Sequence, residues 1–362
     1  MSEIVIIGGG LAGLTAALRL SDPHRVTLLE ARPRLGGQIL THREAGHVIE
    51  RGAEGFVFRS EAVPKLAADL GIGDELMGQA VMTSMGFDGQ QLRTLAPGEA
   101  ATFLGFQVPK DDLGKGIRTM RRGMGSLIDA LAAAVEARAT VRLGRAVEAL
   151  ELAGPGARLT LEGGERIDAV QVLIATAARP AGLLLEPLFG ELASAVAAGK
   201  TLSSVTVELA FAREALDHPL DATGFVVALE AQQHGLRACT FSTSKFADRA
   251  AQGRVSVRLF FRPTAEELET LDDAAWVARA MAGLRRVIAV TGEPDASWVS
   301  RWGNALPAFD EAHHSAVAAL EAAMEPGPLW LAGSAFHGSG IDAAVRSGEQ
   351  AAARIAGRLS DS

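Results

Sequence analysis

The sequence lacks several features that would point to particular classes of protein. It has no tyrosine among its 362 residues, which excludes any mechanism that depends on a tyrosine side chain. Its single cysteine, Cys239, rules out an intrachain disulfide, and this fits a reducing cytoplasm. Cys239 stands in an expected strand, so we expect it to be buried in the core.

Charge and hydropathy exclude further classes. The net charge is −8 and no basic stripe stands out, so nucleic acid is not an expected partner. No stretch approaches the roughly 20 apolar residues that cross a bilayer, so we expect no transmembrane segment and at most weak peripheral membrane contact. The chain enters an apolar segment almost at once, without the basic region and cleavage site of a secretory leader. We therefore predict a cytoplasmic protein. No metal-ligand spacing and no nucleophile elbow are found.

What the sequence does contain is a cluster of glycines between two apolar segments near its start. Residues 4–7 and 26–29 are apolar, and an alanine- and leucine-rich segment lies between them. The clustered glycines are Gly8, Gly9, Gly10 and Gly13. Gly8 permits a tight turn, Gly10 lets the backbone approach a pyrophosphate, and Gly13 lets a helix pack closely on a strand. This order of elements predicts a βαβ unit that binds a dinucleotide.

An acidic residue completes this pattern. Glu30 ends the second apolar segment and can accept hydrogen bonds from ribose hydroxyls, which favours FAD or NAD over a 2′-phosphorylated cofactor. The N-terminus of the intervening helix offers free N–H groups to the phosphates. Further on, Arg32 and Arg34 are able to neutralise pyrophosphate charge, and Gly36 and Gly37 suit a backbone that passes close to a ligand. For each arginine alone, a solvated side chain is an equally good interpretation.

Hydrophobic patterning predicts the remaining elements. We expect a hairpin over 39–50, helices over 61–77 and 126–137, a buried strand over 169–180, and a helix over about 264–290. Ser126 is the expected N-cap of the second of these helices, and His313 and His314 are expected at a solvated helix start. The expected antiparallel strands are 201–212, 223–230, 236–243 and 254–261. The C-terminus predicts a strand, a glycine loop and a helix that begins near Gly340–Asp342.

Both ends of the chain thus build one domain, with a second domain inserted. We predict an α/β fold with a Rossmann-like FAD-binding domain of the glutathione reductase type, formed by residues 1–56, 120–185 and 296–362. Residues 57–119 and 186–295 would form an α+β substrate domain built on an antiparallel sheet. The oligomeric state is not readable from the sequence.

The sequence resembles the FAD-dependent amine oxidase group, which includes amine oxidases, carotenoid desaturases and protoporphyrinogen oxidases. The opening GGGLAGL and EARPRLGG carry this resemblance. Three later segments resemble protoporphyrinogen/coproporphyrinogen oxidases in particular. They are RGMGSLIDALA (122–132), SRWGNALPAF (300–309) and LAGSAFHGSGIDAAVRSGEQAA (331–352).

The resemblance implies a set of FAD contacts. Gly8–Gly13 would hold the pyrophosphate, Glu30 the adenosine ribose, and Val147 the adenine through its backbone. Gly52–Gly55 would pass the isoalloxazine, with Trp302 nearby. In full, the implied FAD-binding residues are Gly8, Gly9, Gly10, Leu11, Ala12, Gly13, Glu30, Ala31, Arg34, Gly36, Gly37, Gly52, Ala53, Glu54, Gly55, Val147, Trp302, Gly333, Ser339, Gly340 and Ile341.

The substrate site is less sharply defined. Members of this family usually carry a helical, membrane-touching insertion before the glycine-methionine segment, and residues 103–126 pass directly through that place. We therefore expect a substrate cavity that is more open or is closed differently. No catalytic residue is assigned. Candidate substrate contacts are His337, which equally well caps its loop, and Arg262 and Arg301, for which surface ion pairs are the favoured interpretation.

The function implied is an FAD-dependent oxidase of haem biosynthesis. It would oxidise protoporphyrinogen IX or coproporphyrinogen III to the porphyrin by hydride transfer to flavin N5, with O₂ as acceptor and H₂O₂ as product. An amine oxidase or a carotenoid-desaturase-like oxidoreductase is the first alternative, although the absence of tyrosine weakens the amine oxidase. A flavin-binding protein without turnover is the second alternative.

Overall fold

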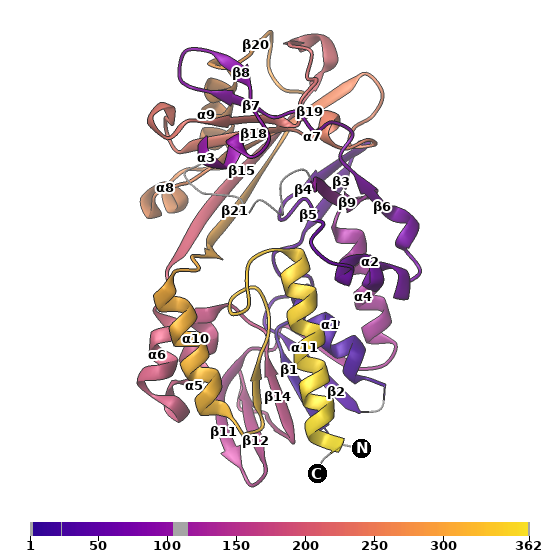
Figure 1. Ribbon diagram of the computed structural model, residues 1–362, viewed down its shortest axis with the longest axis vertical. Coiled ribbons are helices and arrows are strands. Elements are labelled where there is room, and N and C mark those ends of the chain that lie inside the picture. Colours follow the sequence, from indigo (N-terminus) through magenta and orange to yellow (C-terminus); the bar gives the residue numbers. More distant parts are fainter. Residues whose placement is uncertain (1–2, 23, 104–114, 361–362) are drawn as a thin grey trace.

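Two sheets occupy opposite ends of an elongated molecule (Figure 1). The computed structural model describes residues 3–22, 24–103 and 115–360. A parallel sheet lies in the half that holds both chain termini, and a seven-stranded sheet lies in the other half. Within the described residues, no helix combines the length and apolar character needed to cross a bilayer.

The parallel sheet is built on the first apolar segment of the chain. Ile4 and Ile6 are buried on one face, whereas Val5 and Ile7 are buried on the other, as expected for a strand covered on both sides. All neighbouring strands in this sheet are parallel. In order across the sheet they are β10 (Thr140–Leu143), β2 (Arg25–Glu30), β1 (Glu3–Ile7), β14 (Gln171–Ile174) and β22 (Leu329–Leu331).

Helices cover one face of the parallel sheet, and a mixed layer covers the other. The first face packs against α1 (Leu11–Leu20), α4 (Gly125–Glu136) and α11 (Ile341–Ser360). The second packs against α5 (Ala178–Phe189), α6 (Glu191–Ala197), α10 (Glu311–Met324) and an antiparallel sheet. That sheet consists of β11 (Val147–Ala153), β12 (Gly156–Leu161) and β13 (Arg166–Ala169).

The seven-stranded sheet contains the expected antiparallel strands. Across the sheet, its order is β21 (Ala296–Pro307), β15 (Thr201–Ala212), β19 (Arg254–Phe261), β18 (Leu236–Phe241), β17 (Gly224–Val227), β7 (Met85–Phe87) and β8 (Leu92–Thr94). One pairing differs from the expectation, because β7 runs parallel to β17. The short β7 reaches this edge from a distant part of the chain, which local patterning does not reveal.

The two faces of the seven-stranded sheet have opposite character. Alternate residues of β19, among them Val257 and Leu259, pack in an apolar core with Trp276 of helix α9 (Asp273–Arg285). The intervening residues of β19, including Ser256 and Arg258, point to the opposite face, since side chains alternate along a strand. This second face carries polar side chains and contacts the loop that contains Gly52, between the two sheets.

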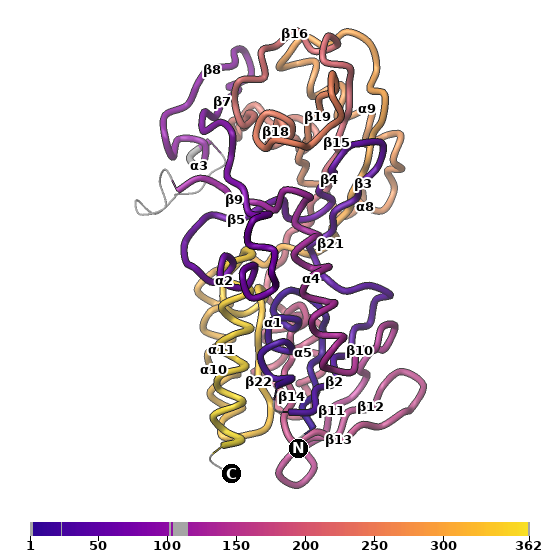
Figure 2. Tube along the Cα trace, turned by 90° about the vertical axis from the view of Figure 1, so that its right-hand side faces the viewer, coloured from indigo at the N-terminus to yellow at the C-terminus, as the bar shows by residue number. Residues whose placement is uncertain are grey.

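Shorter elements fill the region between the two sheets and the edges of the molecule. Figure 2 shows the β3–β4 hairpin, β5 and β9 at the waist between the sheets. The expected hairpin is confirmed by the antiparallel pairing of β3 (Thr41–Glu44) with β4 (His47–Glu50). The remaining elements are β5 (Phe56–Val57), β6 (Leu76–Gly78), β9 (Ile117–Met120), β16 (Leu216–Asp217), β20 (Ala289–Val290), α2 (Ala62–Asp69), α3 (Glu99–Phe103), α7 (Ser242–Lys245), α8 (Ala265–Thr270) and the 3₁₀ turns Gly73–Glu75, Arg213–Ala215 and Leu229–Ala231.

Capping explains where the helices differ from the prediction. The single helix expected over 264–290 is two helices, because Asp272 caps a new one by accepting a hydrogen bond from the Ala275 N–H at 2.8 Å. Ser126 is not an N-cap. It lies inside α4, whose first N–H groups are bound instead by two distant side chains, Glu50 and Thr41.

The parallel sheet draws its strands from residues 1–56, 120–185 and the C-terminal segment, as the domain prediction requires of its FAD-binding part. Residues 296–307, which the prediction grouped with that part, form β21 and pair with β15 in the seven-stranded sheet. A long pair of adjacent strands therefore connects the two halves. The domain limits themselves stay a prediction.

Candidate cofactor and active site

The glycine turn between β1 and α1 is shaped by close contacts within the protein. Gly8 has a φ of +110°, and a Cβ there would lie 2.6 Å from the Ala175 carbonyl oxygen. A Cβ on Gly13 would lie 2.0 Å from the Gly8 carbonyl oxygen, so this glycine brings helix and strand together. Leu11 and Ala12 begin the helix and are buried. These two glycines are thus required by the fold itself.

Gly10 is different, because nothing in the protein requires a glycine there. Its φ of −76° suits any residue, and a Cβ would meet no protein atom nearer than the Gly37 Cα at 4.0 Å. Gly10 is also the N-cap of α1, and no side chain caps that helix. Room beside an uncapped helix N-terminus, opposite the backbone of Gly37, fits a phosphate group.

The second wall of this cradle is the turn at Gly36–Gly37. The Gly36 N–H donates to the Gly9 carbonyl at 2.8 Å, which holds the two glycine turns together. Both Gly36 and Gly37 have positive φ values, +96° and +58°, which side chains disfavour. That this backbone passes close to a ligand stays a prediction.

Glu30 closes one end of the cradle. Its carboxylate accepts the Gly9 N–H at 2.7 Å and the Arg32 N–H at 2.9 Å. A carboxylate has about four lone-pair sites, so two remain for hydroxyl donors. The chain beside it leads into β11, since the Arg145 N–H donates to the Glu30 carbonyl at 2.9 Å. Val147 therefore starts its strand close to this end, and Ala31 is exposed next to it.

The C-terminal loop meets the same edge of the parallel sheet. As expected, α11 begins at Ile341 after a glycine-rich loop. Gly333 has a φ of +113°, and a Cβ there would lie 3.5 Å from the Ala12 Cβ. A Cβ on Gly348 would lie 2.4 Å from the Ala12 carbonyl oxygen, so α11 is in close contact with α1. Two helix N-termini thus converge near the glycine turn.

The loop Glu50–Phe56 joins the cradle to the seven-stranded sheet. Each of three carbonyls in this loop accepts a hydrogen bond from a side chain on a different strand. Trp302 Nε1 donates to Arg51 at 2.6 Å, Arg258 Nη2 to Gly52 at 2.7 Å, and Thr119 Oγ1 to Glu54 at 2.7 Å. The loop is therefore fixed by β21, β19 and β9 together.

A cluster of mostly buried charged residues lies beneath this loop, and the sequence analysis named only one of its members, Glu54, as an implied FAD contact. Its buried members are the cations Lys245, Arg249 and Arg258 and the acids Glu50 and Glu208, and the half-buried Glu54 completes it. The sequence signal was present as single charges within apolar strands, such as TVELAF and VSVRLFF. Fully buried charges are rare unless they are paired.

The charges in this cluster shift one another's pKa values. Burial acts to raise the pKa of Glu54, but the neighbouring Lys245 and Arg258 outweigh it, so that pKa lies below its usual value. Burial raises the pKa of Glu208 despite Arg258 opposite it. Burial lowers the pKa of Arg249.

Comparison with known proteins identifies the cofactor class. The sequence matches the family described as flavin containing amine oxidoreductase in two overlapping stretches, residues 11–105 and 79–356. The chain belongs to this family. It is accordingly an FAD-dependent oxidoreductase, and the cradle described above fits a dinucleotide cofactor.

Several relatives are named as porphyrinogen oxidases. The coproporphyrinogen III oxidase of Bacillus subtilis is 23% identical over 462 aligned positions, which cover 96% of this chain and 97% of that protein. The enzyme of the same name from Mycobacterium tuberculosis (strain H37Rv) is 26% identical, with 94% of each chain covered. Because this chain has only 362 residues, the Bacillus alignment contains long gaps in it. The position of the missing insertion stays a prediction.

Solved structures share the fold. A candidate protoporphyrinogen oxidase from Exiguobacterium sp. 255-15 superposes with a TM-score of 0.85 at 23% identity, over 99% of both chains. Wild-type putrescine oxidase bound to putrescine gives a TM-score of 0.74 at 17% identity, over 98% of this chain and 99% of that one. At these identities the likeness concerns the fold of the flavin-containing amine oxidoreductase family.

Within this flavoenzyme, two predicted site residues, Arg34 and His337, are held by hydrogen bonds to other protein groups. Arg34 donates to the carbonyls of Leu35 at 3.0 Å and Gly37 at 2.7 Å, so it braces the second glycine turn. His337 is bound at both ring nitrogens, to Ser347 Oγ at 2.8 Å and to Glu321 Oε1 at 2.9 Å. This arrangement favours a loop-capping role for His337.

The other candidates lie apart from the cradle. Arg301 pairs with Asp273 and donates to the Leu271 carbonyl at 2.9 Å, which matches the expected surface ion pair. Arg262 is exposed at the end of β19. Cys239 is buried as expected, and burial raises its pKa well above the usual value. His313 is buried with its Nε2 2.8 Å from the Ala335 carbonyl, so the expectation of a solvated pair was wrong for this residue.

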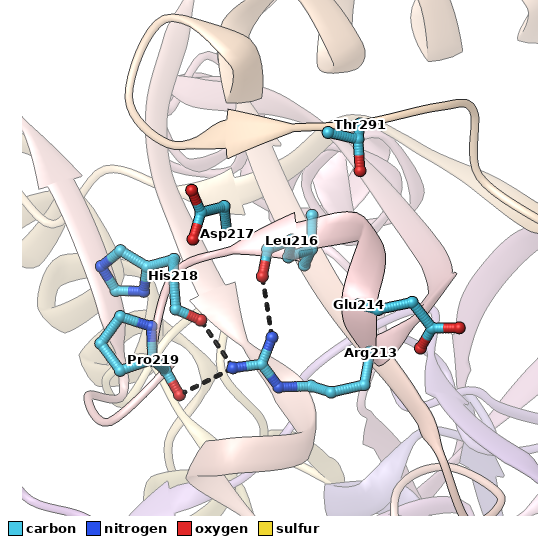
Figure 3. Close-up of a pocket in the computed structure, with 7 residues that line it drawn as sticks. All are labelled: Arg213, Glu214, Leu216, Asp217, His218, Pro219 and Thr291. Carbon is cyan, nitrogen blue, oxygen red and sulfur yellow. Dashed lines mark hydrogen bonds between the residues drawn. The ribbon is translucent and has the colours of Figure 1, made fainter.

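An open surface pocket at the far tip of the molecule is not part of this site. It encloses about 600 Å³ and is lined by Arg213, Glu214, Leu216, Asp217, His218, Pro219 and Thr291. Figure 3 shows the Arg213 guanidinium turned back onto the carbonyls of Leu216, His218 and Pro219. Arg213 therefore stabilises the loop 216–219 through these hydrogen bonds.

Proposed function

We propose that this flavoenzyme oxidises a porphyrinogen, coproporphyrinogen III or protoporphyrinogen IX, to the porphyrin, with O₂ as electron acceptor and H₂O₂ as product. The observation that carries the proposal is the end-to-end similarity to coproporphyrinogen III oxidases on a chain whose dinucleotide cradle is intact. Bound FAD would supply the redox chemistry by accepting a hydride from a substrate carbon.

The cradle supports one placement of the cofactor. Its pyrophosphate would lie between Gly10 and Gly37 at the N-terminus of α1, with the adenosine ribose at Glu30 and the adenine beside the Val147 backbone. The isoalloxazine would then extend along Gly52–Gly55 toward Trp302. This direction is supported by the way the Glu50–Phe56 loop continues from the cradle to the seven-stranded sheet.

The N-terminus of α11 would serve the other end of the ring system. Ser339 and Gly340 are exposed just before the helix, and a Cβ on Gly340 would meet no protein atom within 4 Å. The 20-residue helix directs its positive end to this place, where it would stabilise negative charge at the pyrimidine end of the ring.

Arg262 is the proposed contact for substrate carboxylates. It follows the end of β19, which pairs with the start of β18 at Leu236, next to Arg237. Burial and the charge of Arg262 lower the pKa of Arg237. Two neighbouring guanidiniums, at the start of β18 and just after the end of β19, favour an anionic ligand. Arg301 forms an ion pair with Asp273 and is therefore the weaker candidate for binding a substrate carboxylate.

An aerobic assay tests the proposed function. Protein with bound FAD would be supplied separately with coproporphyrinogen III, protoporphyrinogen IX and putrescine, while porphyrin fluorescence and H₂O₂ are followed. We expect a fluorescent porphyrin and H₂O₂ from a porphyrinogen and neither from putrescine. H₂O₂ from putrescine alone would make the chain an amine oxidase, and no turnover of any substrate would favour a non-catalytic flavoprotein. An Arg262→Ala variant should raise KM most for coproporphyrinogen III, which carries more carboxylates.

A further inference from the structure

One buried cation of the seven-stranded sheet, Arg258, donates a hydrogen bond to the backbone of the Glu50–Phe56 loop. Arg258 is buried in the middle of β19, on the polar face of that sheet. Its Nη2 donates to the Gly52 carbonyl at 2.7 Å and lies 3.4 Å from Thr206 Oγ1. A hydrogen bond from a charged donor to a buried carbonyl is among the stronger kinds.

Acidic residues hold this guanidinium in place from two sides. Arg258 Nη1 lies 3.8 Å from Glu54 Oε2, and Glu54 is in turn paired with Lys245. Glu208 faces Arg258 directly across the β15–β19 ladder. The guanidinium also lies over the ring of Phe260 at 4.8 Å. In this orientation, the Arg258 guanidinium donates to the Gly52 carbonyl while it contacts Glu54 and Phe260.

Ordinary stability does not explain the whole arrangement. Arg258 Nε and Nη1 and Glu208 Oε1 are buried without a hydrogen-bond partner. Replacing buried ion pairs by apolar residues is often neutral or stabilising, so the ions point to a role other than stability. Within this arrangement, Arg258 donates a hydrogen bond to the loop carbonyl of Gly52.

We infer that Arg258 is a positioning residue for the flavin, which fixes Gly52–Gly55 against the isoalloxazine and thereby sets the reduction potential of the bound cofactor. The inference rests on the proposed placement of the isoalloxazine along this loop. Arg258 acts through the Gly52 carbonyl. Its positive charge, held in a low-dielectric interior, also stabilises electrons added to a nearby ring.

The test compares FAD-loaded wild type with Arg258→Met by visible spectroscopy and by redox titration of the bound flavin. We expect stoichiometric FAD in both, because the pyrophosphate cradle is elsewhere. In the variant we expect shifted flavin absorption bands and a lower midpoint potential. Arg258→Lys keeps the charge but loses the guanidinium fork, so it should recover most of the potential and keep a shifted spectrum. If Arg258→Met does not fold, the spectrum and midpoint potential of Arg258→Lys test the inference instead.

Arg279→Met is a matched control on the other side of the same sheet. Arg279 pairs with Glu267 at 2.8 Å, approaches the His234 carbonyl at 3.4 Å and lies over the Trp276 ring at 4.8 Å. Its loss should leave the flavin spectrum and potential unchanged. Wild-type values in both Arg258 variants, or equal shifts in Arg279→Met, would overturn the inference. These readouts require bound FAD but no substrate, so failure of the porphyrinogen assay would not affect them.

Discussion

The two halves of this molecule are specified by different means. The parallel-sheet half is apolar on both faces, and its critical contacts are close approaches of backbone at Gly8 and Gly13. The seven-stranded half is apolar on one face only, and its other face carries buried ions such as Arg258 and Glu208. With FAD placed as proposed above, the shape of the backbone in the first half would hold the pyrophosphate, and buried charge in the second half would surround the isoalloxazine.

The largest expected effect would test whether shape governs the first half. In Gly13→Ala the new Cβ would lie 2.0 Å from the Gly8 carbonyl oxygen, so α1 cannot pack on β1. We expect loss of the cooperative thermal transition. Gly10→Ala is the matched control, since its Cβ has open space, and we expect its stability without FAD to stay within about 1 kcal/mol of wild type. Similar thermal unfolding of Gly13→Ala and Gly10→Ala would contradict the claim that the fold requires glycine at position 13 but not at position 10.

The next effect would test whether charge governs the second half. Arg249→Met leaves Glu50 without the cation that lies 3.5 Å away and removes a hydrogen bond of 2.9 Å to Thr119. Breaking a buried pair in this way costs about 3–5 kcal/mol, measurable by urea unfolding. Arg142→Met removes an exposed ion pair with Glu165 and should cost much less. Equal losses of unfolding free energy in the two variants would show that burial does not make the Arg249 ion pair more important for stability than the exposed pair.

A third change separates cofactor binding from folding. In Gly10→Val the side chain would occupy the space assigned to the pyrophosphate, so we expect the apoprotein to fold while FAD binding weakens. Loss of two phosphate hydrogen bonds is worth about 3 kcal/mol, or ~100-fold in Kd by fluorescence titration. Stoichiometric FAD with unchanged affinity would place the pyrophosphate elsewhere.

The smallest effect concerns pH. The pKa of Glu54 is lower in the folded protein than its usual value, because Lys245 and Arg258 outweigh burial. Its contribution to stability is therefore present above the unfolded pKa of about 4.3 and is lost as pH falls through the folded value. Unfolding free energies measured from neutral to acidic pH should fall less steeply in Glu54→Gln than in wild type. Parallel curves would mean that Glu54 is not the titrating group.

The same contrast explains what the sequence revealed. The β1–α1–β2 unit, the hairpin expected over 39–50 and observed over 41–50, and the start of α11 were predicted correctly because each depends on residues close together in the chain. The parallel β7–β17 pair and the capping of α4 by Glu50 and Thr41 depend on residues far apart, and local patterning misses them. His313 was expected in solvent for the same reason, since its partner is Ala335 in a later loop.

The candidate site follows this division. The glycine spacing and Glu30 were readable because a dinucleotide demands particular residues at fixed offsets. The buried ion cluster was not, because Glu54, Lys245 and Arg258 are separated by long stretches and meet only in the folded chain. In the sequence, Lys245 and Arg258 are isolated charges, and most isolated charges are solvated, whereas Glu54 was named only through the family resemblance.

A single anaerobic turnover tests the central claim, that electrons from a porphyrinogen enter the FAD held by this chain. FAD-loaded protein would be mixed with coproporphyrinogen III without oxygen, and the visible flavin absorbance followed. The account predicts bleaching of the flavin band, followed by recovery of the band and formation of H₂O₂ when oxygen is admitted. An oxidised flavin spectrum that persists unchanged with coproporphyrinogen III, and likewise with protoporphyrinogen IX, would contradict it.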